Sequence, residues 1–336
     1  MKKLILNDEN KDFCKIIELI EKSRENALRK VNEELIMRYW NVGKFLSNEI
    51  QNHNFGESYI DGIAKEIKEN YPEIKGFNRR GLYRMKQFYE TYKDNEFVST
   101  LLTQISWSQH LAILSSSKSD EERQFYLNLS IKERYSVREL QRQIDSGYFQ
   151  RYMLSKEKVG PLAVPEKIKN EFLDSYVLEF LDLPETFSEH DFQKAIIQNI
   201  KKFILEFGKD FTFIGEEYKV QVGGHDYFID LLFYHRGLAC LVAFELKIGA
   251  FKPEYIGKVN FYLEALDREH KKEHENPSVG VVLCSSKDDE VVEFAISRSL
   301  SPTLIAEYQT KLIDKDLLKQ KLHEFSLLAE NVDEEI

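Results

Sequence analysis

The sequence lacks the features that mark membrane, secreted and zinc-ribbon proteins. No apolar run in its 336 residues approaches the ~18 residues that a membrane span needs. The opening MKKLILNDEN turns polar after three apolar residues, which argues against a secretory signal. Cys14, Cys240 and Cys284 lie far apart, so we expect buried thiols in a reducing compartment rather than a disulfide framework. We therefore expect a cytoplasmic protein with no membrane partner.

An excess of positive charge is also absent. The 57 Asp and Glu outnumber the 47 Lys and Arg, which gives a formal net charge of −10. This balance argues against a surface coated with nucleic-acid-binding charge. The charge is uneven, however, because residues 1–160 hold 27 basic and 24 acidic residues. The acidic excess therefore lies in the second half, and the length allows two domains.

What the sequence does have, first, is a helical half. Residues 10–30 and 31–50 are amphipathic, and no strand-like alternation appears before residue 150. Gly160-Pro161 and Pro165 make 154–167 the best linker. We therefore predict a helical domain over 1–153 and a second domain over 168–336.

A basic stretch lies in the first half, between Lys75 and Lys93, and Asn78 is a suitable N-cap for a helix there. Leu82, Met85, Tyr89 and Tyr92 have the spacing of one buried stripe. The basic residues of this helix can contact phosphates of DNA or RNA, as in a helix-turn-helix. The alternatives are a solvated surface and a docking surface for a partner protein or a second copy of the chain. The residues of this basic face are Arg79, Arg80, Arg84 and Lys86.

The second half alternates between helical and strand-like patterns. Ser188 with Asp191 begins a helix that Gly208 ends. The predicted elements after it are strands at 211–224 (with a bend at Gly215), 227–235 and 238–249, a helix at 251–269, a strand at 277–286, a helix at 288–300 and a strand at 303–308. This order predicts a mixed α/β domain with an antiparallel meander followed by crossover-linked strands.

Charged residues interrupt two of these apolar strands. Asp230 lies in YFIDLLFYH, and Glu245 and Lys247 lie in LACLVAFELKIG. A lone charge in a strand core costs several kcal/mol unless it is paired or bound to a metal. Either these charges face water at an edge, or something holds them together.

The turn between the strands sets their register. If residues 236–239 form the turn, His235 pairs with Cys240 and Asp230 faces Glu245, with Cβ atoms roughly 5 Å apart. Two such carboxylates repel by roughly 3 kcal/mol at an effective dielectric of 20. They therefore share a proton or bind a hard cation such as Mg²⁺. Lys247 points to the same face and can orient a water, which together suits metal-assisted phosphodiester hydrolysis.

These residues resemble the PD-(D/E)xK nuclease superfamily. LEFG, YFIDLLFYHR, FELKIGAFKPEY and VNFYLEAL, with RYWNVGKFL and GFNRRGLYRMKQFYETY before them, are similar to its YhcG-type members. The resemblance implies a restriction-endonuclease-like domain with an α-βββ-α-β core behind a helical domain. It implies Asp230 and Glu245 as ligands of Mg²⁺ or Mn²⁺, Leu246 as a carbonyl ligand and Lys247 as the catalytic lysine. DNA is then a more natural substrate than RNA.

Members of this superfamily often add an acidic residue from the first helix. Glu206 falls within the buried arc of helix 188–208, so it is our candidate, and Gln198 points away. The alternative is that Glu206 caps or pairs near the helix end. Some members also carry a Gln and a Tyr four residues apart after the lysine. Here Lys258 stands in the Gln position and Tyr262 is present, and both are candidates for contact with nucleic acid.

The sequence also contains histidines near the proposed site, and it allows two alternative functions. His225, His235 and Tyr234 are expected to pack or to lie at the rim, and His270 and His274 lie in a solvated charge run. The leading hypothesis is a metal-dependent nuclease. The alternatives are a non-catalytic nucleic-acid-binding or assembly protein that keeps the nuclease fold, and a structural cation site.

Overall fold

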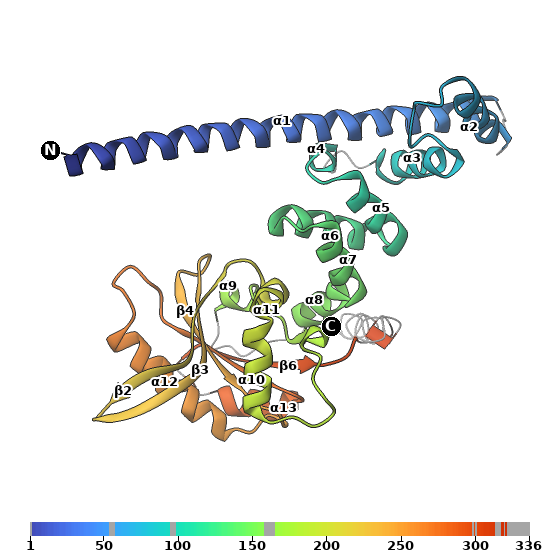
Figure 1. Ribbon diagram of the computed structural model, residues 1–336. Coiled ribbons are helices and arrows are strands. Elements are labelled where there is room, and N and C mark those ends of the chain that lie inside the picture. Colours follow the sequence, from blue (N-terminus) through green and yellow to red (C-terminus); the bar gives the residue numbers. More distant parts are fainter. Residues whose placement is uncertain are drawn as a thin grey trace. The chain divides into compact units, whose positions relative to one another are not determined.

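The computed structural model describes residues 2–53, 58–94, 99–157, 165–297, 299, 301–312, 317, 318 and 320. The chain divides into two compact units, Met1–Gln141 and Arg142–Ile336 (Figure 1). The first is helical and the second is a mixed α/β domain, as predicted. Residues 158–164 of the expected linker lie outside the described residues. Among the helices that are described, none has the length and apolar character to cross a membrane.

One long helix dominates the first unit. The amphipathic stretches expected at 10–30 and 31–50 join into α1 (Lys2–His53), because neither proline nor glycine interrupts residues 2–42. The other described helices are α2 (Ser58–Asn70), α3 (Arg79–Tyr92), α4 (Ser99–Leu102), α5 (Trp107–Ser116), α6 (Asp120–Glu133) and α7 (Val137–Asp145), which runs into the second unit.

The C-terminal half of α1 packs closely on α3. A Cβ at Gly43 would lie 2.1 Å from the Met85 carbonyl oxygen, so only glycine permits this approach. Asn78 caps α3 as predicted, because its side chain accepts a hydrogen bond from the Gly81 N–H at 2.9 Å. The predicted stripe differs at one position, since Phe88 is buried whereas Tyr89 is only partly so.

The second unit follows the predicted order from its first long helix onward. Its elements are α8 (Tyr148–Glu157), α9 (Glu166–Lys169), β1 (Ser175–Val177), a 3₁₀ turn (Glu179–Leu181), α10 (Glu189–Gln198), α11 (Ile200–Phe207), β2 (Phe211–Val222), β3 (His225–His235), β4 (Cys240–Leu246), α12 (Glu254–Glu269), β5 (Val279–Cys284), α13 (Asp289–Ile296) and β6 (Thr303–Gln309). The helix expected over 188–208 breaks at Asn199, which leaves the helical region with φ −114° and ψ 24°. The short strand β1 was not predicted.

Six strands form one sheet in the order β1-β6-β5-β4-β3-β2. The meander β2-β3-β4 is antiparallel, and β5, β6 and β1 add to it as parallel strands. The bend predicted at Gly215 is a register shift in β2 between Phe213 and Gly215. This is the mixed sheet that the sequence pattern predicts.

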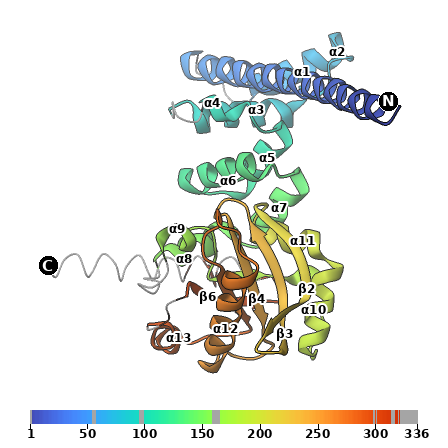
Figure 2. The same ribbon diagram turned by 90° about the vertical axis from the view of Figure 1, so that its left-hand side faces the viewer.

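Helices cover both faces of this sheet (Figure 2). Residues of α10 and α11, including Phe192 and Phe203, form one apolar core with the sheet. Residues of α12 and α13, including Leu263 and Val292, form the other. A Cβ at Gly280 of β5 would lie 2.3 Å from Val259 Cγ1, so this glycine lets α12 rest directly on the sheet.

The cysteines behave as expected where they are described. Cys240 and Cys284 are buried and free of disulfides, and burial raises the pKa of their thiols to about 12 and about 11. Both are therefore inert packing residues. The side chain of Cys14 lies outside the described part of the chain.

Candidate active site

The central strands separate where the sequence places its charges. β3 and β4 pair as far as Leu231 and Phe244, which confirms the register predicted from the turn. Beyond this pair, side chains satisfy the backbone groups. The Gln193 amide donates to the Asp230 carbonyl at 2.8 Å, and the Leu246 N–H donates to Asp230 Oδ2 at 2.7 Å. Asp230 therefore stands at the opening between two strands.

Glu245 lies beside this opening and is almost fully buried, with 1% of its surface exposed. Its Oε1 accepts a hydrogen bond from Lys258 Nζ at 2.6 Å and lies 2.9 Å from Lys247 Nζ. Lys247 Nζ also donates to the Leu246 carbonyl at 3.0 Å. Glu245 Oε2 is buried without a hydrogen-bond partner among the described residues. The expected triplet of Glu245, Leu246 and Lys247 is thus one contact cluster.

Burial and mutual repulsion act on the two carboxylates. Desolvation, followed by the charge of Glu245, raises the pKa of Asp230 to about 6. The side chains of Lys258 and Lys247 oppose this rise. Asp230 in this position therefore favours a bound proton or a nearby cation.

Both lysines stay charged. Burial lowers the pKa of Lys247, but hydrogen bonds to Glu245 and Glu189 outweigh it and raise the pKa above the usual value. The same balance, with Glu245 as partner, raises the pKa of Lys258. Each is therefore a fixed ammonium rather than a proton acceptor at neutral pH.

Glu189 is a site residue that the sequence reasoning missed. Its Oε2 lies 2.9 Å from Lys247 Nζ, and its side chain is 47% exposed. It occupies the first turn of α10, where Ser188 and Asp191 form the predicted capping box. The sequence feature that could have identified Glu189 is its spacing of four residues from Gln193. This spacing places both side chains on the same face of α10, toward the same strand ends.

Tyr262 links α12 to the arm of β3. Its hydroxyl donates to the Phe228 carbonyl at 2.7 Å, and burial raises its pKa. Its ring lies 5.5 Å from Lys258 Nζ. Tyr262 thus holds the backbone two residues before Asp230 and helps to position Lys258. These are the two residues that the sequence singled out on this helix.

Glu206 is not brought to this cluster. It is fully buried and accepts hydrogen bonds from Arg142 at 2.8 Å, Arg151 at 2.9 Å and the Val177 N–H at 2.9 Å. The three donors lie on α7, α8 and β1. This geometry fits the pairing role that was the alternative for Glu206, because its oxygens are already satisfied.

The basic face of α3 is partly neutralised within the first unit. Arg79 forms an ion pair with Asp61, and Lys86 Nζ lies 2.8 Å from Glu90 Oε2. Arg80 is exposed and Arg84 is partly buried. The four residues therefore share a helix, but two of them already have acidic partners.

The histidines near the hairpin differ in burial. His235 is buried, and its Nδ1 accepts a hydrogen bond from the Leu238 N–H at 3.0 Å, as expected for a packing residue. His225 is exposed and Tyr234 is partly buried. His270 differs from its predicted solvated position, because its Nδ1 lies 3.2 Å from the Tyr218 hydroxyl.

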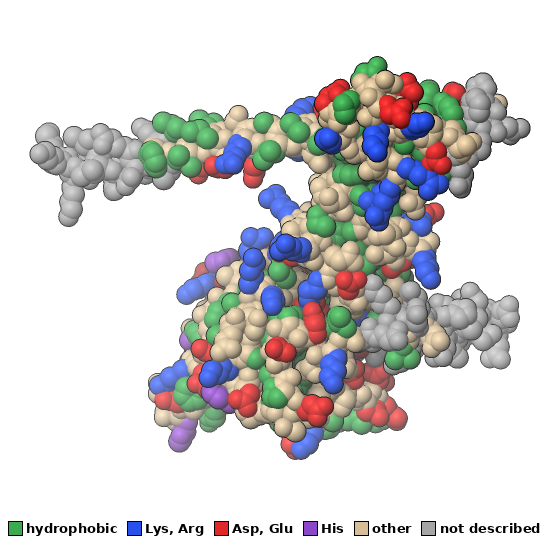
Figure 3. All heavy atoms as spheres, turned by 45° about the vertical axis from the view of Figure 1, so that its right-hand side comes forward, with side chains coloured by type: hydrophobic (Ala, Val, Ile, Leu, Met, Phe, Trp, Pro, Cys, Tyr) green, Lys and Arg blue, Asp and Glu red, His purple; other side chains and the backbone are tan. Residues whose placement is uncertain are grey.

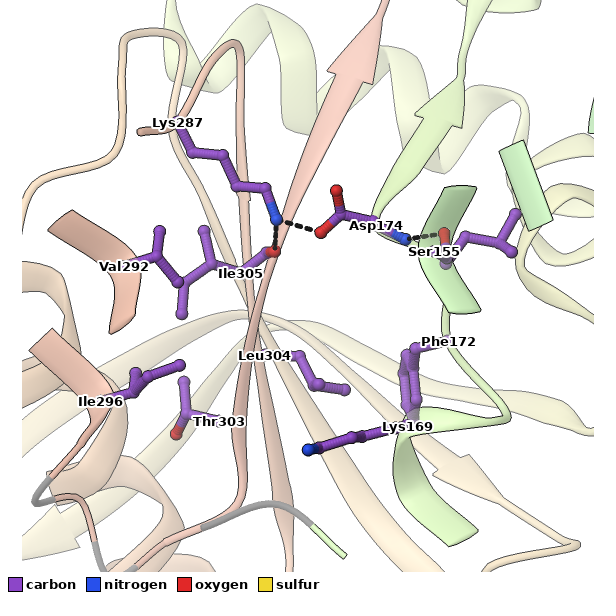
Figure 4. Close-up of a pocket in the computed structure, with 11 residues that line it drawn as sticks. Ser155, Lys169, Phe172, Asp174, Lys287, Val292, Ile296, Thr303, Leu304 and Ile305 are labelled. Carbon is purple, nitrogen blue, oxygen red and sulfur yellow. Dashed lines mark hydrogen bonds and ion pairs between the residues drawn. The ribbon is translucent and has the colours of Figure 1, made fainter. Parts of the chain in front are cut away.

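A separate hollow lies against β6 and α13 (Figure 4). Lys287 points into it from above, and its ammonium contacts Asp174 and the Ile305 carbonyl. The remaining walls are mainly apolar, with Phe172, Ile296 and others. The charge of Lys287 is therefore already compensated inside the protein.

The sheet, its splayed strands and the Asp-Glu-x-Lys cluster define the PD-(D/E)xK class of nuclease domains. Residues 169–323 match the family described as "YhcG PDDEXK nuclease domain", and residues 15–151 match the "DUF1016 N-terminal domain". The chain therefore combines a DUF1016 N-terminal domain with a YhcG PDDEXK nuclease domain. It is 28% identical to YhcG of Escherichia coli (strain K12), provisionally named a nuclease, over 91% of this chain and 92% of that protein.

Two solved structures align with part of this chain. A repair endonuclease from Pyrococcus abyssi aligns with 38% of this chain at a TM-score of 0.27 and 15% identity. EndoMS in a complex with double-stranded DNA aligns with 38% of this chain at a TM-score of 0.28 and 17% identity. The alignments span about half of those chains, 50% and 47%.

Proposed function

We propose that this protein is a metal-dependent nuclease that hydrolyses phosphodiester bonds, in DNA rather than RNA. The observation that carries the proposal is Glu245 Oε2, a buried carboxylate oxygen without a hydrogen-bond partner among the described residues, next to Asp230. A buried oxygen of this kind costs free energy unless a cation or a proton satisfies it.

The donor set fits Mg²⁺ or Mn²⁺. Asp230, Glu245 and the Leu246 carbonyl are oxygen ligands, and hard cations of this size take few carboxylates and keep several waters. No cluster of three or more His, Cys, Asp or Glu suited to a metal exists within the described residues. With two carboxylates and one carbonyl, the donor set leaves coordination positions for water and phosphate. When bound, the ion supplies Lewis-acid stabilisation of the phosphate charge and activates water.

The chain's own groups divide the remaining work. Lys247, held between Glu245 and Glu189, keeps its proton and orients the attacking water while it stabilises negative charge. Lys258 is 44% exposed on the side chain and can exchange its contact with Glu245 for a phosphate oxygen. Glu189 is a positioning residue, because it fixes the ammonium of Lys247.

The two domains have separate tasks in this proposal. Residues 168–336 carry the catalysis, 154–167 are the linker and 1–153 the helical domain, of which residues 142–153 belong to the second compact unit. The exposed Arg80 and partly buried Arg84 support contact of the helical domain with phosphates or with a partner. The ion pairs of Arg79 and Lys86 reduce that contribution.

The test is cleavage of supercoiled, linear and single-stranded DNA, and of RNA, with Mg²⁺, Mn²⁺ or EDTA. We expect cutting of DNA that needs the metal and is lost in Lys247→Ala. Lys252→Ala removes an exposed lysine five residues later and serves as the control. Equal cutting by both variants would point to contamination. Retained DNA binding without metal-dependent cutting would favour the non-catalytic binding protein.

A further inference from the structure

The N-terminal half of α1 exposes an apolar stripe. Every described residue from Lys15 to Val31 is exposed, and Figure 3 shows hydrophobic side chains along this helix. The large apolar residues are Phe13, Ile16, Ile17, Leu19, Ile20, Leu28 and Val31, with exposed fractions from 42% for Ile17 to 67% for Leu19. A contiguous apolar surface of this kind marks an interface.

The apolar residues of the stripe lie on one side of the helix. At ~100° per residue, all of these apolar residues except Leu19 fall within an arc of about 120°. Arg24 lies in the middle of this arc, and Glu21 lies at its edge. A shallow hollow runs along the stripe, lined by Ile16, Leu19, Ile20, Ser23, Arg24 and Ala27. Small Ser23 and Ala27 leave room there for another helix to approach.

The stripe is distinct from the face that packs on α3. That face belongs to the C-terminal half of α1 and carries the buried Ile36, Gly43 and Leu46. The segment 13–31 is about 27 Å long, and a single helix of that length without packing is marginal in water. A partner that covers the stripe would supply the missing packing.

The charged residues of the segment that carries the stripe indicate which kind of partner fits it. Residues 11–34 carry six basic and six acidic side chains, so the segment has no net charge. Phosphates attract segments with an excess of Lys and Arg, and interfacial membrane helices carry a polar face rich in these residues. A segment with balanced charges is complementary to another segment with the same balance.

We propose that a second copy of this chain covers the stripe, with the two α1 helices antiparallel. A parallel pair in register would place Arg24 against Arg24 in the middle of the apolar seam, where the like charges repel. The antiparallel pair brings Arg24 next to Glu21 of the other copy, and Ile17 next to Leu28. By symmetry each of these contacts forms twice. Of the two orientations, only the antiparallel one gives Arg24 an acidic partner.

Charge exchange tests the pairing in the full-length protein by analytical ultracentrifugation. We expect the measured molar mass of the wild type to be twice that of the 39.6-kDa chain. Glu21→Arg and Arg24→Glu each weaken association by about tenfold, because each leaves like charges opposed. The double variant E21R/R24E restores it. Glu18→Arg, the same change on the opposite side of the helix, leaves association unchanged.

A disulfide test fixes the orientation. In a Cys14→Ser background, chains with Ile17→Cys are mixed with chains with Leu28→Cys and oxidised. Antiparallel helices give the mixed disulfide, whereas parallel helices link Ile17→Cys to itself. A wild type that is monomeric at all concentrations, a double variant that stays dissociated, or a dominant self-linked product overturns the proposal. None of these measurements depends on nuclease activity.

Discussion

At the residue scale, Glu206 is a buried carboxylate with a hydrogen-bond partner for each oxygen. Its two oxygens bind Arg142, Arg151 and the Val177 N–H in a fully buried setting. Loss of this charge leaves the buried Arg151 without the carboxylate that it pairs with, although Arg142 keeps Glu179, and this is strongly destabilising. The stability of the second unit is therefore expected to depend on Glu206 more than the chemistry does.

We predict that Glu206→Gln lowers the free energy of unfolding by about 3–5 kcal/mol. Urea denaturation followed by circular dichroism measures this, with the exposed Glu185→Gln as control. Unchanged stability together with abolished cleavage would instead assign Glu206 to catalysis.

His110 gives the first unit a pH dependence. It is fully buried, its Nε2 lies 2.8 Å from the Leu102 carbonyl, and burial lowers its pKa from 6.5 to about 4. Between these two pH values the unfolded chain binds a proton that the folded chain refuses. Stability therefore falls as the pH drops from about 6.5 toward 4, by up to about 3 kcal/mol.

Tryptophan fluorescence during urea unfolding reports on this unit, since Trp40 and Trp107 both lie in it. We predict that His110→Gln flattens the slope between pH 6.5 and 4, whereas the exposed His274→Gln leaves it unchanged. An unchanged slope in His110→Gln would show that other groups cause the acid sensitivity.

At the element scale, the position of α12 depends on Gly280. We predict that Gly280→Ala destabilises the second unit by about 1–3 kcal/mol, because the new Cβ would clash with Val259 at 2.3 Å. Gly257→Ala is the matched control on α12, where a Cβ meets nothing within 4 Å. It should stabilise by about 0.4–1 kcal/mol. Calorimetry distinguishes the two, and equal effects would contradict the packing account.

The hairpin shows which parts of the site the sequence can predict. Its register follows from one turn and a period of two, so the placement of Asp230, Glu245 and Lys247 could be worked out locally. Glu189 and Gln193 lie on α10, far from the hairpin in the sequence. Their contacts with these strands depend on the tertiary fold and cannot be predicted from local sequence patterns. The burial of Glu206 was predictable from its helix face, but its arginine partners lie more than 50 residues earlier.

The break at Asn199 and the continuity of α1 were missed for related reasons. Asn199 lies within an otherwise regular apolar pattern, and its amide donates back to the Ala195 carbonyl at 3.1 Å. Such competition with the helical backbone depends on the environment more than on the pattern. In α1, two amphipathic segments were expected at 10–30 and 31–50, although no residue between them ends a helix.

At the scale of the whole molecule, pairing through α1 would place two catalytic domains in one particle. Two such sites in one particle can cut both strands of a duplex in one encounter. We predict that Arg24→Glu converts supercoiled plasmid mainly to nicked circles, whereas the wild type and E21R/R24E yield more linear product. Gel electrophoresis measures the ratio of linear to nicked plasmid. The same ratio for the wild type, Arg24→Glu and E21R/R24E would show that cleavage of both strands does not depend on pairing through α1.

The central claim is that Asp230 and Glu245 bind a divalent cation that phosphodiester hydrolysis requires. The most direct measurement is the cleavage rate as a function of Mg²⁺ concentration for wild type, Asp230→Asn and Asp226→Asn. Asp226 is the control, since it lies on the same strand and pairs with Lys219 at the surface. We predict saturable Mg²⁺ dependence in wild type and Asp226→Asn, with at least about 100-fold slower cleavage in Asp230→Asn. Cleavage by Asp230→Asn at the wild-type rate and Mg²⁺ dependence would contradict the claim.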